Sequence, residues 1–292
     1  KGGLGITPLS MGGAYTGYAS GIETSYYNPA NLIEQSSAYG YQNFSYHNGA
    51  TYQHHAHFVK LSPLGYTYWE RSDKASHHVN VQAFSLGQSG RKGVDWGLTY
   101  KTIRATLSGQ QHTLWTSDFG VLIRLFPFAN IGFLAQDVYK RTSLIPSTFR
   151  AGLALFKPNR RVVFTTDWIQ HRTPNSNSYL HAGLQLNVLQ GLSLTSGISP
   201  NEVQAGAAFA LPGISITTGV RKKNNTSPHY LIGFKTHATK HTLSIPSRYS
   251  VFKPHTYATF SIGSNLTQGQ SEISLFNGSK IGSNDLLKLI YD

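Results

Sequence analysis

The sequence predicts an all-β fold, a transmembrane antiparallel up-and-down β-barrel of about fourteen strands with an N-terminal plug in its lumen. Apolar and polar residues alternate with a period of two from about residue 38 almost to residue 263, as they do in strands that bury one face. Charged residues make up only 13% of the chain, whereas soluble domains carry about 25%. Aromatic residues reach 12%, and such rings form the interfacial girdles of outer-membrane barrels. Together these features predict an outer-membrane protein.

The first expected region, residues 1–36, has no regular alternation and is interpreted as irregular or short-helical. Residues 11–30 combine a glycine-rich turn, many small residues and an Asn-Pro-Ala end. This combination, placed ahead of a long series of strands, indicates a plug or hatch segment. We expect Lys1 to follow a processed signal peptide.

The second expected region, residues 37–263, is the transmembrane barrel. In residues 94–101 the apolar side chains occupy every second position: Val94, Trp96, Leu98 and Tyr100. The opposite face of successive strands holds Gly, His, Gln and occasional charges, which suits a polar lumen better than the Lys- and Glu-rich outer face of a soluble sandwich. Short turns between the strands favour a sequential meander. Of about fourteen to sixteen strand-like runs, the even-number habit of bacterial barrels favours fourteen.

Six charged residues are expected to point into the barrel. Charges in such a place must pair with one another or meet water. We interpret them as charge pairs that hold the barrel to its plug. They are Asp95, Lys101, Asp118, Arg124, Arg150 and Asp167.

The third expected region, residues 264–292, differs in composition and is interpreted as a periplasmic extension. Residues 271–276 predict a short strand, and Ser283 is placed to cap an amphipathic helix that runs to Ile290. We expect this helix to begin a further domain.

Several functional classes find no support in the sequence. No apolar run approaches the ~18 residues of a membrane-spanning helix, so spanning must be done by strands. Lys and Arg outnumber Asp and Glu by 25 to 12, which favours contact with anionic lipid such as lipopolysaccharide; nucleic-acid motifs are absent, so no nucleic-acid partner is expected. The chain has no cysteine and no Gly-x-Ser-x-Gly or His-Glu-x-x-His motif. Neither an enzymatic activity nor a cofactor is expected.

A group of histidines gives the only candidate metal ligands. His55 and His57 would share one face of a strand, and two imidazoles at this spacing can converge on zinc or copper. The sequence lacks a recognised ligand spacing, so we favour polar residues at a lumen or rim and expect no metal.

The N-terminal region resembles the FadL/PorV superfamily of outer-membrane barrels. The resemblance is carried by the runs Met11–Tyr15 and Tyr26–Leu32, and more weakly by residues 255–263 at the end of the barrel region. It implies a lumenal hatch in which glycine supplies positive φ and proline ends a local helix. The hatch residues that it implies are Met11, Gly12, Gly13, Asn28, Pro29 and Ala30.

The resemblance implies two different functions. FadL-like members pass hydrophobic compounds through the lumen, whereas PorV-like members bind a secretion translocon. Short loops and the absence of a convergent polar site favour the second, a scaffold with protein partners in an envelope complex. The alternative is a passive transporter of a hydrophobic ligand. The tail from Ser271 to Asp292 also resembles the start of an SppA-type peptidase domain.

Overall fold

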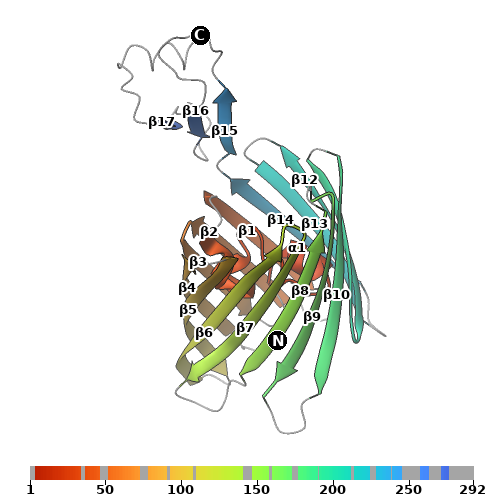
Figure 1. Ribbon diagram of the computed structural model, residues 1–292. Helices are drawn as coiled ribbons and strands as arrows, with labels where there is room; N and C mark the ends of the chain where they lie inside the picture. Colours follow the sequence, from red (N-terminus) through yellow and green to blue (C-terminus); the bar gives the residue numbers. More distant parts are fainter. Residues whose placement is uncertain are drawn as a thin grey trace. The chain divides into compact units, whose positions relative to one another are not determined.

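The computed structural model divides the chain into two compact units, residues 1–236 and residues 237–292, which are described separately (Figure 1). Fourteen strands form a barrel in the first unit, and three form a small sheet in the second. The structure describes residues 4–33, 37–46, 52–72, 78–90, 93–107, 110–140, 147–157, 160–172, 177–189, 191–211, 214–223, 228–237, 239–244, 257–262 and 271–275.

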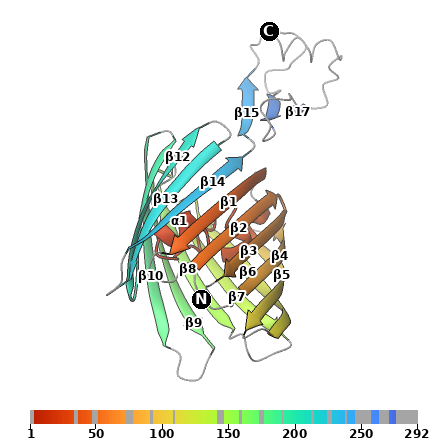
Figure 2. The same cartoon turned by 180° about the vertical axis from the view of Figure 1, so that it is seen from behind.

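The first unit is a closed β-barrel in which strands pair in chain order. Consecutive strands are antiparallel, and β1 pairs with β14 to close the barrel (Figures 1 and 2). The predicted up-and-down barrel of fourteen strands is confirmed. The strands are β1 Ser37–Tyr46, β2 Tyr52–Leu61, β3 Leu64–Ser72, β4 His78–Ser89, β5 Val94–Leu107, β6 Gln110–Phe126, β7 Ala129–Lys140, β8 Thr148–Phe156, β9 Val162–His171, β10 Ser178–Leu189, β11 Leu192–Ser199, β12 Glu202–Leu211, β13 Ile214–Lys223 and β14 His229–His237.

The alternation in each strand separates an apolar outer wall from a polar inner wall. In β5, Leu98 and Tyr100 point outward and are 46% and 48% exposed, while Asp95 and Thr99 point inward and are buried. β9 repeats the pattern, with Phe164 outside. A lipid-facing wall of this kind, closed so that no strand edge is left unpaired, is how strands cross a bilayer.

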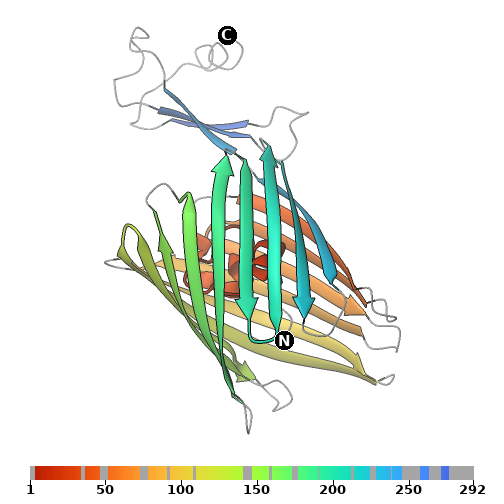
Figure 3. The same cartoon turned by 90° about the vertical axis from the view of Figure 1, so that its right-hand side faces the viewer.

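The inside of the barrel contains the N-terminal segment, residues 4–33, which runs between the walls (Figure 3). It forms helix α1 (Ile6–Ser10), helix α2 (Thr24–Tyr27) and the 3₁₀-helix η1 (Pro29–Ile33). α1 contacts β11, β12 and β13, and η1 contacts β3 to β6. Most of its side chains are buried, so the segment provides the apolar core of this unit. Among the helices of the described residues, none is long and apolar enough to cross a membrane.

The described residues of the second unit form a three-stranded antiparallel sheet. It consists of β15 (Thr239–Ser244), β16 (Tyr257–Ile262) and β17 (Ser271–Leu275), with β16 in the centre. This differs from the expected barrel boundary at residue 263, because the barrel ends with β14 and β16 pairs elsewhere. Alternation marks a strand but does not say which sheet the strand joins. The expected helix from Ser283 to Ile290 lies outside the described residues.

Candidate functional site

The N-terminal segment is held to the barrel wall by the carboxylate of Asp167, on β9. Asp167 is fully buried. Its Oδ2 accepts hydrogen bonds from the backbone N–H of Tyr15 and of Thr16, each at 3.0 Å, and from Thr16 Oγ1 at 2.6 Å. Oδ1 lies 3.2 Å from the Thr16 N–H. Hydrogen bonds to a charged acceptor are stronger than neutral ones, so Asp167 is a principal attachment of the segment.

Two asparagines connect the segment to itself and to β6. The Asn28 side chain donates to the carbonyls of Thr16 and Val121, both at 3.0 Å, and accepts from the Ala30 N–H at 3.2 Å. Asn31 donates to the Ala19 carbonyl at 2.6 Å. Both side chains are buried, so these bonds cross-link the turns of the segment in the absence of long helices.

One ion pair and one charged donor also reach the segment. Glu23, fully buried, lies 2.6 Å from the Lys235 ammonium of β14. Undocking the segment would leave Lys235 without this partner, and removing one partner of a buried pair leaves an uncompensated charge, so the pair favours the docked position. Arg124, which pairs with Asp95 of β5 within the wall, donates to Asn31 Oδ1 at 3.0 Å.

A ring of inward-facing glycines lets the backbone of the segment approach the wall closely. Three pairs of them face each other across neighbouring strands, Gly97 with Gly120, Gly132 with Gly152, and Gly183 with Gly197. At each of these six an added Cβ atom would come within 3.0 Å of an atom of the segment. We call these six residues the glycine belt. Any larger residue in the belt would push the segment off the wall.

The segment itself begins to turn at its own glycines. Gly12 and Gly13, which follow α1, have φ values of 71° and 78°, a region that residues with a Cβ rarely adopt. The Gly12 carbonyl accepts a hydrogen bond from His181 Nδ1 of β10 at 2.5 Å. Pro29 follows Asn28, the C-cap of α2, and begins η1, where Ala30 is buried.

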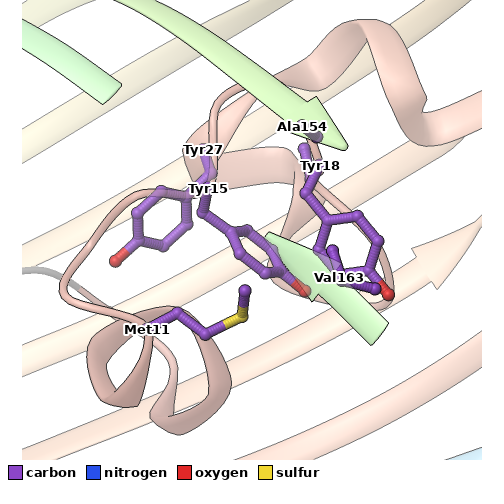
Figure 4. Packing of buried hydrophobic residues seen from close by; sticks show 7 residues of the cluster. Met11, Tyr15, Tyr18, Tyr27, Ala154 and Val163 are labelled. Atoms are coloured by element: carbon purple, nitrogen blue, oxygen red, sulfur yellow. The ribbon is translucent and has the colours of Figure 1, made fainter. Parts of the chain in front are cut away.

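An aromatic cluster fills the space between the segment and β8–β9 (Figure 4). The ring of Tyr15 packs edge-on against those of Tyr18 and Tyr27, with both centroid distances 5.4 Å. Met11 packs beside them, and Ala154 and Val163 complete the cluster on the barrel side. Edge-to-face pairs of this kind stabilise a core by about 0.5–1.5 kcal/mol each beyond the area they bury.

Burial changes the acid–base properties of these tyrosines. Loss of hydration raises the pKa of Tyr15 well above its usual value, and the negative charge of Glu23 raises it further. The pKa of Tyr27 is also raised, chiefly by burial. These phenols therefore stay neutral hydrogen-bonding groups over the physiological pH range.

The predicted inward charges of β5 and β6 meet in a triad. Lys101 Nζ lies 2.7 Å from Asp118 Oδ1 and 2.7 Å from Asp137 Oδ1. All three side chains are nearly fully buried. Asp137 was not anticipated, because a β-bulge in β7 turns both Gln136 and Asp137 inward and breaks the alternation there. The triad joins three neighbouring strands.

The remaining one of the six predicted inward charges, Arg150 of β8, faces a polar cavity. Its Nη1 donates to the Gly13 carbonyl at 3.4 Å, and its guanidinium lies 5.7 Å from the centre of the Tyr27 ring. Arg221 of β13 forms a two-bond pair with Glu202 of β12, at 2.6 and 2.5 Å. Neither Glu202, at the start of β12, nor Arg221, near the end of β13, was among the inward charges predicted from the sequence.

The two candidate metal ligands lie on the outer wall. His55 is hydrogen-bonded to the Tyr41 hydroxyl at 3.0 Å and His57 to the Tyr39 hydroxyl at 2.8 Å. In the part of the chain that the structure describes, no three His, Cys, Asp or Glu side chains are grouped to hold a metal ion. Both imidazoles thus take part in tyrosine contacts across β1 and β2.

Comparison with solved structures identifies barrels of the same fold. The toluene transporter TbuX of Ralstonia pickettii is similar with a TM-score of 0.61 at 11% identity, over 80% of this chain and 98% of that chain. The CymD monoaromatic hydrocarbon channel has a TM-score of 0.58 at 11% identity (80% and 97%). The Pseudomonas putida toluene transporter TodX has 0.57 at 12% identity (80% and 97%). No family model and no curated protein matches the chain.

At such identities the likeness concerns the fold. The shared fold is a closed antiparallel β-barrel, as the sequence predicted, and its apolar outer wall is typical of a barrel that crosses a membrane. These neighbours are transport channels rather than enzymes. The PorV-like part of the resemblance and the expected role in protein secretion gain no support from them.

Proposed function

We propose that this protein is a passive outer-membrane channel for small hydrophobic molecules, in which the N-terminal segment acts as the hatch. The observation that carries the proposal is the position of residues 4–33 inside a closed fourteen-stranded barrel whose fold is shared with hydrocarbon channels. A solute can pass only if this segment shifts or leaves a path beside it.

The attachments of the segment support a movable hatch that stays within the barrel. Besides the aromatic cluster and the glycine belt, polar contacts hold it, chiefly those of Asp167, Asn28 and Glu23. Each such contact contributes on the order of 1–3 kcal/mol. In this scheme the expected residues Met11, Gly12, Gly13, Asn28, Pro29 and Ala30 shape the hatch, and Asp167 is its main latch.

The scaffold interpretation that the sequence favoured is not carried further. It depended on short loops and on the lack of a convergent polar site, and the structure contains such a site around Arg150. Lipopolysaccharide and protein partners remain expectations from the sequence, and the hydrophobic ligand is the partner that the neighbouring structures favour.

The proposal is tested by solute uptake in cells. The protein is produced in a Gram-negative strain with an intact lipopolysaccharide layer, and the initial rate of radiolabelled toluene accumulation is measured. We expect the wild type to raise this rate above that of cells without the barrel. Asp167→Asn should raise it further, because weaker hydrogen bonds to Tyr15 and Thr16 increase the population of the undocked segment.

A matched control removes a carboxylate on the outer wall. Glu70→Gln loses one negative charge on the outer face of β3, where the Tyr68 hydroxyl donates to it at 2.6 Å, and should leave uptake at the wild-type rate. Heat-modifiable migration on gels confirms that each variant is folded. Uptake equal to that of barrel-free cells, for both wild type and Asp167→Asn, would refute the channel function.

A further inference from the structure

We infer that the polar cavity beside the segment is a binding site for a small organic carboxylate. This site does not depend on passage of hydrophobic molecules through the barrel. Its inner part is about 70 Å³ and is lined by the segment and by β8, β10, β11, β12 and β13, with Tyr27, Arg150, His181, Glu202, Gln204 and Arg221 among its residues. An adjoining outer part of about 230 Å³ shares Arg150, His181, Glu202 and Arg221 and adds Lys223.

Three buried polar atoms in the inner cavity lack a hydrogen-bond partner among the described residues. They are the hydroxyl of Tyr27, Nε of Arg150 and Oε1 of Gln204. Tyr27 and Gln204 are 1% and 4% exposed. A buried polar group without a partner is destabilising. Two of the three, the Tyr27 hydroxyl and the Arg150 Nε–H, are donors, which indicates a site for an occupant that accepts hydrogen bonds.

The neighbouring groups are already engaged, which determines what remains available. Gln204 Nε2 donates to Glu202 Oε2 at 3.1 Å, and both carboxylate oxygens of Glu202 accept hydrogen bonds from Arg221. The Gly12 carbonyl can only accept, so Nδ1 of His181 carries a proton in their hydrogen bond. The groups left to bind an oxyanion are therefore the Arg150 Nε–H and the Tyr27 hydroxyl.

The lining of the inner cavity favours an anion over an uncharged solute. It carries two guanidinium groups, of Arg150 and Arg221, and one carboxylate, of Glu202; the buried carboxylate of Asp167 also lies within electrostatic range of Arg150. Arginine recognises carboxylates through parallel hydrogen bonds in one plane. A phosphate dianion would bring a second negative charge close to the carboxylate of Glu202. An uncharged hydrocarbon would leave both donors, the Arg150 Nε–H and the Tyr27 hydroxyl, unpaired.

The cavity lies at the end of the barrel that such a solute reaches from outside. The cavity residues lie at the barrel end where β9 connects to β10 and β13 connects to β14. These connections are long, from 171 to 178 and from 223 to 229, whereas the opposite end has short turns such as the one from 61 to 64. Outer-membrane barrels carry short periplasmic turns and longer extracellular loops.

The test is direct binding to the purified protein in detergent, measured by titration calorimetry with sodium benzoate. Salt near 0.15 M screens binding to exposed charges. We expect benzoate to bind with 1:1 stoichiometry. Arg150→Met should weaken binding roughly ten- to hundredfold, because a charge-assisted hydrogen bond is lost, and Arg150→Lys should recover part of it. Tyr27→Phe should weaken binding by a smaller factor while keeping the ring in place.

Controls separate the site from general charge and from misfolding. Arg104→Met removes an exposed arginine of β5 and should leave benzoate binding unchanged. Hydrogen exchange at Gly12 and Gly13 verifies that the segment stays docked in Arg150→Met and Tyr27→Phe. Benzoate binding that is absent, or unchanged in both variants, would overturn the site; tighter binding of inorganic phosphate, or equal binding of benzamide, would overturn the carboxylate assignment. Toluene uptake is not measured here, so each proposal can fail without the other.

Discussion

Two charge clusters lie inside the same barrel and have opposite compositions. On β5–β7, one ammonium, of Lys101, is held between two carboxylates, with both distances 2.7 Å. On β8, β12 and β13, one carboxylate, of Glu202, is bonded directly to the guanidinium of Arg221 and accepts from Gln204, while the guanidinium of Arg150 lines the same cavity. The first cluster is closed on itself, whereas the second keeps Arg150 Nε unpaired among the described residues. The closed cluster therefore stabilises the wall, and the open one is available to a ligand.

The comparison predicts that the two clusters respond differently to loss of their cation. Lys101→Met leaves two buried carboxylates without a counter-charge and should lower the free energy of unfolding by roughly 3–5 kcal/mol. Arg150→Met, which breaks one long hydrogen bond and a cation–π contact, should lower it by only about 1 kcal/mol. Denaturant unfolding of the protein in lipid or detergent measures both.

Lys222→Met provides the baseline for this pair, since Lys222 is exposed on β13. It should change the unfolding free energy by no more than about 0.5 kcal/mol. Equal losses for Lys101→Met and Arg150→Met would mean that the cavity cluster is as structural as the triad.

A second prediction concerns the glycine belt, the surface on which the segment rests. In Gly197→Ala the new methyl group would meet the backbone of Met11 and Gly12, which cannot rotate away. We expect a loss of roughly 1–3 kcal/mol and faster hydrogen exchange in residues 10–13. Gly219→Ala is the matched control, because the nearest atoms lie 3.2 to 3.7 Å from its added Cβ. Identical exchange in the two variants would contradict close backbone packing at the belt.

The smallest expected effect is on pH dependence. Burial raises the pKa of Tyr15 and Tyr27 above the ordinary value of about 10, so the neutral phenols favour the docked segment. This contribution is complete below pH 10 and declines as pH rises further, because the undocked phenols then ionise more readily. Absorbance titration of phenolate should reveal a delayed fraction that shrinks in the double variant Tyr15→Phe/Tyr27→Phe. An unchanged titration curve in that variant would argue against burial of these rings.

Parts of the candidate site were accessible from the sequence, and parts were not. Asp95, Lys101, Asp118 and Asp167 were expected to point inward, and the structure buries all four. Asp137 escaped notice because the bulge in β7 violates the period of two on which that expectation rested. The ion pair between Glu23 of the segment and Lys235 of the last barrel strand could not be predicted from the sequence, because nothing in it shows that β14 lies beside the segment.

The sequence by itself determined the sequential order of the barrel strands and the wall that faces lipid. These properties follow from alternation and short turns, which are local and are repeated in every strand. The number fourteen came from the even-number habit of bacterial barrels, since alternation alone allowed fourteen to sixteen strands. Only the tertiary structure decided where the barrel ends, which charges are satisfied by a partner and which surround a cavity. Such pairings depend on register and bulges across strands distant in sequence, and a shift of one residue would exchange the two faces of a strand.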